Sequence, residues 1–230
     1  MSRREPAWES FAQDQPEHYI WTSGDPADPD FQEQFAASGR QQIDIVLRAT
    51  ATYRTGGARV VEYGCGLGRM LLPMSEHFDR ALGVDIAPTM LDGLRRRAAD
   101  AGITTIDTAL SSEPWAAGVD ADLLYCWAVL QHIPSWRAIS EAVETMASAL
   151  RPETGVGYLH FDTRPRTPLY LARFAVPDPL LPHRWRKSIR RIRRRPAAVR
   201  ALLHSCGLTV VAEQHEAADH HAFIVKAPRR

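Results

Sequence analysis

The stretch at residues 60–70 constrains the fold more than any other part of this sequence. It reads Val-Val-Glu-Tyr-Gly-Cys-Gly-Leu-Gly-Arg-Met, so an apolar start is followed by three alternate glycines, Gly64, Gly66 and Gly68. Glycine is needed where the backbone takes a positive φ or where a ligand contacts the backbone. A helical pattern resumes at residues 70–78, and the first turn of a helix offers unpaired N–H groups to a polar ligand. We therefore predict a strand, a tight turn and a helix that together hold a small polar ligand.

Apolar runs and helical patterns alternate along the rest of the chain. Strands are predicted at residues 81–86, 103–110, 121–128, 155–161, 208–213 and 222–227. Helices are predicted at residues 88–102, 136–150 and 197–205. This pattern predicts an α/β fold with helices on both faces of a mainly parallel sheet. The last two strands are expected to pair antiparallel because only a short polar segment joins them.

Two segments interrupt this alternation. The segment before the glycines contains Trp8, Tyr19 and Trp21 in a polar context punctuated by prolines. We interpret it as a helical lid, and the alternative is that these aromatic side chains seal an edge of the sheet. The other segment follows the fifth predicted strand, and we interpret it as an insertion that forms a substrate lid. We predict a single domain, residues 1–230, whose parts are the N-terminal lid, 1–40, the core, 41–161 and 197–230, and the insertion, 162–196.

Composition and charge exclude several classes of function. The formal net charge of +1 gives the chain no overall field that would attract nucleic acid or a membrane surface. No signal-peptide pattern and no apolar run near the length of about 18 residues needed for a membrane span are present. Cys65, Cys126 and Cys206 are far apart and odd in number, which argues against a disulfide framework and a zinc site. We expect a protein of a reducing, cytoplasmic setting, with neither a metal nor a membrane partner.

The spacing of the glycines limits the classes of ligand that this turn could bind. A dinucleotide-binding turn follows Gly-x-Gly-x-x-Gly, whereas here Arg69 occupies the third glycine position and the third glycine comes one residue early. Glu62 lies two residues before the first glycine, where its carboxylate would repel a pyrophosphate but could bind a cation or hydroxyl groups. Asp85 ends the next strand, about 20 residues on, where a carboxylate can accept hydrogen bonds from ribose hydroxyls. These features favour a nucleoside with a positively charged tail that lacks phosphate.

On these residues and three further motifs, the sequence resembles the class I S-adenosylmethionine-dependent methyltransferases of small-molecule type. The motifs are Glu-Tyr-Gly-Cys-Gly-Leu-Gly-Arg at 62–69, Gly-Val-Asp-Ile-Ala-Pro-Thr-Met-Leu at 83–91, Asp-Leu-Leu-Tyr-Cys-Trp-Ala-Val-Leu-Gln-His-Ile-Pro at 122–134 and Ala-Leu-Arg-Pro at 149–152. The resemblance covers the chain from about residue 41 to its end, apart from the insertion. It implies a Rossmann-like, seven-stranded, mainly parallel sheet with an antiparallel last strand. It also implies methyl transfer to an O-, N- or C-nucleophile of a small organic acceptor, with S-adenosylhomocysteine as the product, for instance in specialised metabolism.

The resemblance also implies roles for individual residues. The glycine turn would pass beneath the methionine part of the cofactor, with Glu62 toward its amino-acid end, and Asp85 would hold the ribose hydroxyls. For the adenine amino group the nearest acid is Asp107, with the backbone of Ala109 and Leu110 as alternatives. The residues expected to bind the cofactor are Glu62, Gly64, Cys65, Gly66, Gly68, Arg69, Asp85, Ile86, Asp107, Trp127 and Ala128.

The candidate catalytic residues follow from the chemistry of this family. Its cofactor carries an activated methyl group, so the protein supplies alignment and, in some members, a base. His132 is the candidate base, at the carboxyl edge of the sheet where open α/β folds bind ligands, and the alternative is a structural role. His160 is a second candidate, while Arg69 is expected either to steer the cofactor carboxylate, to cap the lid or to lie in solvent. The expected substrate-binding residues are Trp8, Tyr19, Trp21, His132 and His160.

Two further features suggest other ligands. His215, Asp219, His220 and His221 resemble a metal cluster, but they fall in a predicted hairpin loop without the spacing of a metal motif, so we interpret them as a solvated turn. Eight of the twelve residues at 184–195 are basic, which is compatible with an RNA or peptide ligand or with a helix across the sheet edge. A methyltransferase of RNA or protein is therefore the alternative function, and a non-catalytic cofactor-binding module is a third. The sequence after the fourth strand lacks the Asn/Asp-Pro-Pro motif of amino-directed nucleic-acid methyltransferases, which favours a small molecule over nucleic acid.

Overall fold

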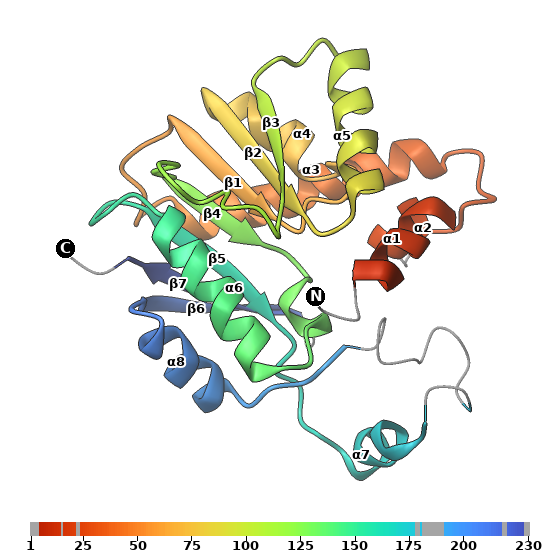
Figure 1. Ribbon diagram of the computed structural model, residues 1–230, viewed down its shortest axis with the longest axis vertical. Coiled ribbons are helices and arrows are strands. Elements are labelled where there is room, and N and C mark those ends of the chain that lie inside the picture. The colour runs from red at the N-terminus through yellow and green to blue at the C-terminus, as the bar shows by residue number, and fades with distance from the viewer. Residues whose placement is uncertain are drawn as a thin grey trace.

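Strands and helices alternate along the chain (Figure 1), as the sequence predicts. The structure is a computed structural model that describes residues 5–14, 16–21, 24–177, 180, 191–217 and 220–227. The strands are β1 (Arg59–Tyr63), β2 (Arg80–Asp85), β3 (Ile106–Leu110), β4 (Leu123–Cys126), β5 (Val156–Phe161), β6 (Thr209–Ala217) and β7 (His220–Lys226). The helices are α1 (Glu5–Asp14), α2 (Pro16–Ile20), α3 (Phe31–Thr50), α4 (Leu71–Met74), α5 (Pro88–Asp100), α6 (Trp136–Ala149), α7 (Pro168–Ala175) and α8 (Pro196–Ser205), with short 3-10 helices η1 (Ser75–His77) and η2 (Leu130–His132). None of the helices described is long and apolar enough to cross a membrane.

The described strands form one sheet in the order β3-β2-β1-β4-β5-β7-β6. Strands β1 to β5 pair parallel with one another, and β7 pairs antiparallel with both β5 and β6. The chain order reverses between β1 and β4, and open α/β sheets bind ligands at such a switch point, beyond the carboxyl ends of the strands. The predicted seven-stranded, mainly parallel sheet with an antiparallel last strand is confirmed.

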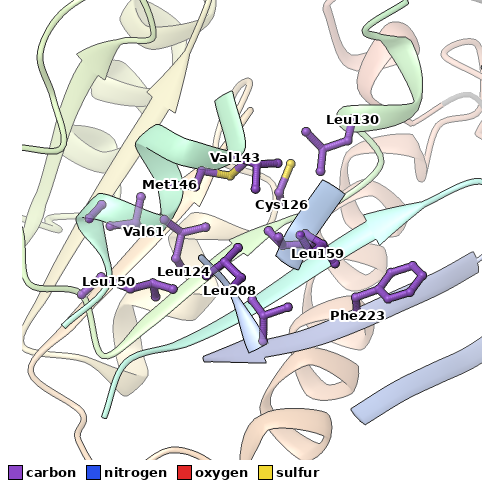
Figure 2. Packing of buried hydrophobic residues seen from close by; sticks show 14 of the residues in the cluster. Val61, Leu124, Cys126, Leu130, Val143, Met146, Leu150, Leu159, Leu208 and Phe223 are labelled. Atoms are coloured by element: carbon purple, nitrogen blue, oxygen red, sulfur yellow. The ribbon is translucent and has the colours of Figure 1, made fainter. Parts of the chain in front are cut away.

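Both faces of the sheet are buried. Side chains of β4 alternate between two cores, with Leu123 and Tyr125 on one face and Leu124 and Cys126 on the other. Helices α3, α4 and α5 cover the first face, and helices α6 and α8 cover the second. Figure 2 shows the second core, in which Met146 of α6 packs with the side chains of the strands. Burial on both faces explains why these strands read as continuous apolar runs rather than as alternating patterns.

The helix predicted after the glycines at residues 70–78 is much shorter in the structure. Helix α4 has a single turn and passes into the 3-10 helix η1. The Ser75 hydroxyl donates to the Leu72 carbonyl (2.7 Å), which occupies an acceptor that a continuing helix would use. Because so short a helix has little dipole, the turn has to hold a ligand through its own backbone and the side chains around it.

Helix α3 crosses the boundary predicted at residue 40 between lid and core without a break. It passes the glycine turn in close contact at Gly39, where an added Cβ would lie 2.1 Å from the Arg69 carbonyl oxygen. Gly39 is buried in the middle of this helix, where glycine is normally unfavourable. The close approach of two backbones explains why a glycine stands there.

A Gly39→Ala variant should therefore destabilise the fold, although alanine favours a helix over glycine by about 1 kcal/mol. The added Cβ meets a backbone atom that cannot rotate away, so α3 has to move from the turn. We expect the free energy of unfolding, measured in urea, to fall by about 1–3 kcal/mol. The control Gly57→Ala adds a Cβ with nothing within 4 Å. An equal effect of both substitutions would contradict this explanation.

The prediction of a hairpin loop around the C-terminal histidines is wrong. His215 lies on β6, and His220 and His221 lie on β7, while Asp219 is outside the described residues. The hairpin continues because these polar side chains stack on each other: the rings of His215 and His221 are 3.8 Å apart, and His221 stacks on Phe223 at 4.2 Å. Two register shifts along β6 accommodate the longer strand pair.

The insertion follows β5, and both of its described ends are hydrogen-bonded to Asp162. Asp162 is fully buried and accepts two hydrogen bonds from the Arg164 guanidinium (3.0 and 2.6 Å), while its carbonyl accepts one from the Arg194 backbone N–H (2.8 Å). The Arg194 guanidinium donates to the carbonyl of Ile133 and lies 5.1 Å from the Trp136 ring. Between these ends, α7 lies away from the sheet (Figure 1).

Candidate functional site

A cavity of about 1090 Å³ is lined by residues at the carboxyl ends of β1, β2 and β4. Helix α2, Trp8 of α1 and the insertion line its other sides. Of the predicted site residues, the cavity brings together Trp8, Tyr19, Trp21, Glu62, Gly64, Cys65, Gly66, Arg69, Asp85, Ile86, Trp127, Ala128 and His132. The predicted residues that do not line it are Gly68, Asp107 and His160.

The glycine turn has the strained backbone that its sequence predicts. Gly64, Gly66 and Gly68 have φ values of +82°, +52° and +80°, which side chains with a Cβ rarely adopt. An added Cβ would lie 2.2 Å from Val129 at Gly64 and 2.8 Å from Ile20 at Gly66. The glycines at 64 and 66 therefore leave room at the wall of the cavity, while Gly68 packs toward the core against α5.

Glu62 is a buried carboxyl group at the wall of the cavity. It accepts a hydrogen bond from the Tyr125 hydroxyl (2.9 Å). Burial raises the pKa of Glu62 to about 8, although the Tyr125 bond and the charge of Arg69 act in the opposite direction. A cation bound beside this carboxyl group would lower its pKa and hold it ionised.

Arg69 is buried rather than solvated, so the alternative of a helix residue in solvent is wrong. Its guanidinium donates to Ser38 Oγ (3.1 Å) and to Gln42 Oε1 (2.6 Å), both on α3. Burial lowers the pKa of Arg69, and the charge of Glu62 opposes that shift. Arg69 thus ties the glycine turn to α3 and places a positive charge near Glu62.

Asp85 joins the glycine turn to the start of α5. Its carboxylate accepts hydrogen bonds from the backbone N–H groups of Gly66 (2.8 Å) and Ala87 (3.0 Å). Burial raises the pKa of Asp85, and these two bonds counteract the rise. Each carboxylate oxygen has a second lone pair, so hydroxyl groups of a ligand can still bind. Cys65 lies beside it as a buried thiol whose pKa is raised by that burial, which makes it a poor nucleophile.

His160 supports the turn after β4 from behind. Ala128 in this turn has a φ of +57°, unusual for a residue with a Cβ, and its N–H donates to His160 Nδ1 (3.0 Å). A ring nitrogen that accepts this bond carries no proton. His160 is buried against the rings of Trp127 (5.9 Å) and His220 (4.2 Å). The structure therefore places His160 behind the cavity wall, where it holds the shape of the turn.

His132 lies on the cavity wall, at the end of the 3-10 helix η2. The Trp8 ring packs nearly perpendicular to the His132 ring, with the ring centres 5.5 Å apart. The neighbouring residue Gln131 also lines the cavity, with its Nε2 3.4 Å from His132 Nε2. In the described part of the chain, the buried Gln131 Oε1 has no hydrogen-bond partner. A polar group of a bound molecule would satisfy it.

The N-terminal aromatic residues cover the cavity, which favours the lid over the alternative of a sealed sheet edge. Phe11 stacks on Tyr19 at 4.4 Å, which joins α1 to α2. The lid is fastened to α5, because Glu9 accepts hydrogen bonds from the N–H (3.2 Å) and hydroxyl of Thr89. Trp21 packs on the aromatic side chains at the start of α3 and also lines the cavity.

Sequence reasoning missed the residues that the insertion contributes. The cavity is also lined by Arg164, Thr167, Leu169, Tyr170, Arg173, Arg191 and Arg193. No motif marks these positions, and only the high arginine content of the segment is visible in the sequence. Gln131 was also missed, and its place next to His132 in the third motif is the signal that could have found it.

Asp107 does not line the cavity in which the adenine is expected. It is exposed on β3, and its carboxylate lies 4.0 Å from the Arg80 guanidinium. The carboxyl end of β3 reaches the cavity instead through Ser111, whose N–H donates to the Asp85 carbonyl (2.8 Å). This position is closer to the backbone alternatives at Ala109 and Leu110 than to Asp107.

The C-terminal histidines form part of a possible donor set. One atom each of Glu213, His215 and His221 lies within 4.8 Å of the others. Arg200 already donates to both carboxylate oxygens of Glu213 (2.5 and 2.7 Å). His221 Nε2 also lies 3.1 Å from Glu213 Oε2, so a metal ion would have to displace bonds that this carboxylate already makes. This cluster fits a paired, stacked strand surface better than a metal site.

Only the last five residues of the basic segment 184–195 are described. Arg194 is buried against η2, and Arg191 and Arg193 line the cavity. The helix predicted for this segment lies mostly outside the described residues and stays a prediction.

Comparison with known proteins assigns the chain to a protein family. A family model described as a methyltransferase domain matches residues 32–213, most of the chain. The chain belongs to this methyltransferase domain family. This agrees with the resemblance on which the site residues were predicted.

Curated relatives of this methyltransferase-family chain match part of its length. The ubiquinone biosynthesis O-methyltransferase of Xanthomonas axonopodis pv. citri (strain 306) is 29% identical over 168 residues, which are 69% of this chain and 66% of that protein. The aklanonic acid methyltransferase DauC of Streptomyces sp. (strain C5) is 35% identical over 77 residues, 32% of each chain. The chain thus spans less than two thirds of the length of these curated relatives.

Solved structures share the fold over the whole chain. Magnesium protoporphyrin IX methyltransferase (ChlM) from Synechocystis PCC 6803, with bound SAH, has a TM-score of 0.66 at 19% identity and covers 98% of this chain and 100% of its own. An S-adenosylmethionine-dependent methyltransferase from Clostridium acetobutylicum ATCC 824 has a TM-score of 0.64 at 11% identity and covers 96% and 99%. At these identities the similarity establishes the Rossmann-like fold.

Proposed function

We propose that this protein transfers a methyl group from S-adenosylmethionine to a small organic acceptor and releases S-adenosylhomocysteine. The observation that carries the proposal is that one cavity is lined both by the glycine turn with Glu62 and Asp85 and by Trp8 and His132. A donor and an acceptor can therefore meet in it. The relatives named as O-methyltransferases favour an oxygen nucleophile.

The residues of one half of the cavity fit this cofactor. Glu62 offers a buried carboxyl group to the cationic amino end, and Asp85 keeps lone pairs for the ribose hydroxyls. Ile86 would pack on the adenine, and Trp127 and Ala128 would lie near the sulfonium. The cofactor supplies a methyl group that is already activated, so the protein has to align the reactants and exclude water.

Different parts of the chain are expected to bind the cofactor and the acceptor. We infer that residues 41–161 and 197–230 hold the cofactor, and that residues 1–40 and 162–196 shape the acceptor side. The acceptor oxygen forms a bond to the methyl carbon while the carbon–sulfur bond breaks and its electron pair stays on sulfur. The proton of the acceptor hydroxyl has to leave, and His132 is the residue that we propose as its base. Trp8, packed on His132, helps to keep water from this place.

A His132→Ala variant should lower kcat by a factor of about 10² or more, because a positioned base contributes roughly 10² to 10⁴. Its affinity for S-adenosylhomocysteine should not change, and part of the rate should return at high pH, where the acceptor ionises by itself. The control is His204→Ala, which alters an exposed histidine on α8. Unchanged kcat in His132→Ala would leave His132 only a structural role.

The function is tested by incubating the purified protein with S-adenosylmethionine and a panel of phenols and catechols. Formation of S-adenosylhomocysteine and of the methylated product is followed by mass spectrometry, and binding of S-adenosylhomocysteine by calorimetry. Acceptor-dependent product is the expected result. A folded protein that neither binds S-adenosylhomocysteine at about 1 mM nor forms it would overturn the proposal. Binding with methyl transfer only to RNA or a peptide would favour the alternative function.

A further inference from the structure

Acidic and basic residues are distributed unequally between the two halves of the cavity: Arg69 and the acidic residues lie beside the glycine turn, whereas the charged residues that the insertion adds to the lining are all arginines. The described carboxylates that line it are Glu62 and Asp85, both beside the glycine turn. The insertion contributes four arginines to the lining, Arg164, Arg173, Arg191 and Arg193. No described acidic residue lines that half of the cavity. The half expected for the acceptor is therefore lined by basic residues and by no described acid, although the chain as a whole is nearly neutral.

The arginines of this half differ in their described partners. Arg164 forms an ion pair with the buried carboxylate of Asp162. Arg193 donates instead to the Pro165 carbonyl (2.7 Å), and its guanidinium lies 4.6 Å from the centre of the Tyr170 ring. Within the described part of the chain, no carboxylate pairs with Arg193.

Arg193 is also held in position. Its backbone N–H donates to the Tyr170 hydroxyl (3.0 Å), and its carbonyl accepts from Arg166 Nε (2.9 Å). An arginine whose backbone and side chain are both fixed loses less conformational entropy when it binds a ligand. A guanidinium presents its donors in a planar fork that matches a carboxylate.

The remaining walls of this half suit a flat organic molecule. Tyr170 and Leu169 of α7, Ile133 after η2, and Trp8 and Tyr19 of the lid give it aromatic and apolar surface. Such walls with a few placed polar groups are typical of small-molecule sites. The polar groups here include His132, Gln131 and the arginines of the insertion.

We infer that the acceptor is an aromatic organic anion, whose carboxylate is held by Arg193 while its nucleophile lies toward His132. This rests on the methyl transfer proposed above. A carboxylate at one end and a nucleophile at the other would fix the orientation of the acceptor in the cavity. The net reaction is unchanged, and the anionic group takes no part in it.

The inference is tested with four catechol probes that differ in one group: 3,4-dihydroxybenzoate, its neutral methyl ester, the cationic 3,4-dihydroxybenzylamine and (3,4-dihydroxybenzyl)phosphonate. Each is titrated by calorimetry into protein saturated with S-adenosylhomocysteine. The benzoate should bind about tenfold tighter than the ester or more, since hydrogen bonds between ions are about twice as strong as neutral ones. Its affinity should fall with added salt while that of the ester should not. A phosphonate that binds at least tenfold tighter than the benzoate would overturn the assignment of a carboxylate.

Variants of single arginines test which residue causes the preference for the benzoate over the ester. Arg193→Gln should remove most of the preference for benzoate over ester, and Arg193→Lys should keep part of it. Arg195→Gln, an exposed arginine that does not line the cavity, should leave it unchanged. Equal affinity for benzoate and ester, no binding of the benzoate, or an unchanged preference in Arg193→Gln overturns the inference. Binding of S-adenosylhomocysteine is measured first in each protein, so loss of the cofactor site is recognised separately. If a protein does not bind S-adenosylhomocysteine, the probes are titrated into its cofactor-free form instead.

Discussion

A Gly66→Val variant should lose at least about 100-fold in affinity for S-adenosylhomocysteine, because several cofactor contacts depend on this turn. Gly66 has a φ of +52°, and its N–H donates to Asp85, the residue proposed to hold the ribose. An added side chain would also stand against Ile20 at the wall of the cavity. Calorimetry of the folded variant measures the loss.

The matched control for this substitution is Gly102→Val. Gly102 has a φ of +68°, so valine meets similar backbone strain, but nothing lies within 4 Å of an added Cβ and Gly102 does not line the cavity. This variant should be somewhat less stable and bind S-adenosylhomocysteine as the unaltered protein does. If Gly66→Val also kept its affinity, the glycine turn would not be the cofactor site.

Binding of S-adenosylhomocysteine should release a proton near neutral pH, because it requires Glu62 to ionise. Burial holds the pKa of Glu62 at about 8 in the free protein, and the cationic amino group of the ligand lowers it. The carboxyl group is thus protonated below pH 8 when free and ionised when bound. Affinity should therefore rise with pH between 6 and 7.5, by up to about tenfold per pH unit. Calorimetry in two buffers of different ionisation enthalpy measures the proton directly.

Variants of Glu62 and of its hydrogen-bond partner Tyr125 separate the effect of the Glu62 charge on binding from the effect of packing. Glu62→Gln can still accept the bond from Tyr125, but it should bind about tenfold or more weakly at pH 7.5 and show no pH dependence from this group. Tyr125→Phe removes a bond that lowers the pKa of Glu62, so the pH dependence should remain and shift to higher pH. Equal proton release by Glu62→Gln and the unaltered protein would exclude Glu62 as the source.

The sheet was predictable because its strands are buried on both faces. All four residues of β4 and all six of β5 are buried, so these strands appear in the sequence as mainly apolar runs without a polar residue at every second position. Errors arose where side chains compete with the backbone or stack. Ser75 ends the regular helix after the glycines, and the stacked rings of His215 and His221 extend a hairpin whose polar residues indicated a loop.

It was predictable that the residues proposed to bind the cofactor would lie together, because they are close in sequence to the strand ends. Glu62, the glycines and Asp85 each adjoin a strand whose place in the sheet follows from the alternation. Asp107 does not line the cavity, because it lies within β3 and only the residue after the end of this strand, Ser111, reaches the lining. The sequence also did not show that His160 would accept a hydrogen bond from the Ala128 N–H and lie outside the lining of the cavity.

The acceptor half was not predictable, because it depends on contacts between distant residues. Arg193 reaches the cavity through its bonds to Tyr170 and Pro165, and Trp8 meets His132 across more than half the chain. Such contacts follow from how the insertion and the lid fold over the sheet, and no local pattern encodes them. The arginine content of residues 184–195 suggested RNA, whereas Arg191 and Arg193 of this segment line the cavity that we propose for a small molecule.

The most direct test of the central claim is a crystal structure of the protein grown with S-adenosylhomocysteine. We predict the ligand in the cavity of about 1090 Å³, with its amino group near Glu62 and its ribose hydroxyls within hydrogen-bond distance of Asp85. The space beyond its sulfur should open toward His132 and Arg193. Ligand bound at any other place, or an unliganded cavity at saturating concentration, would contradict the account.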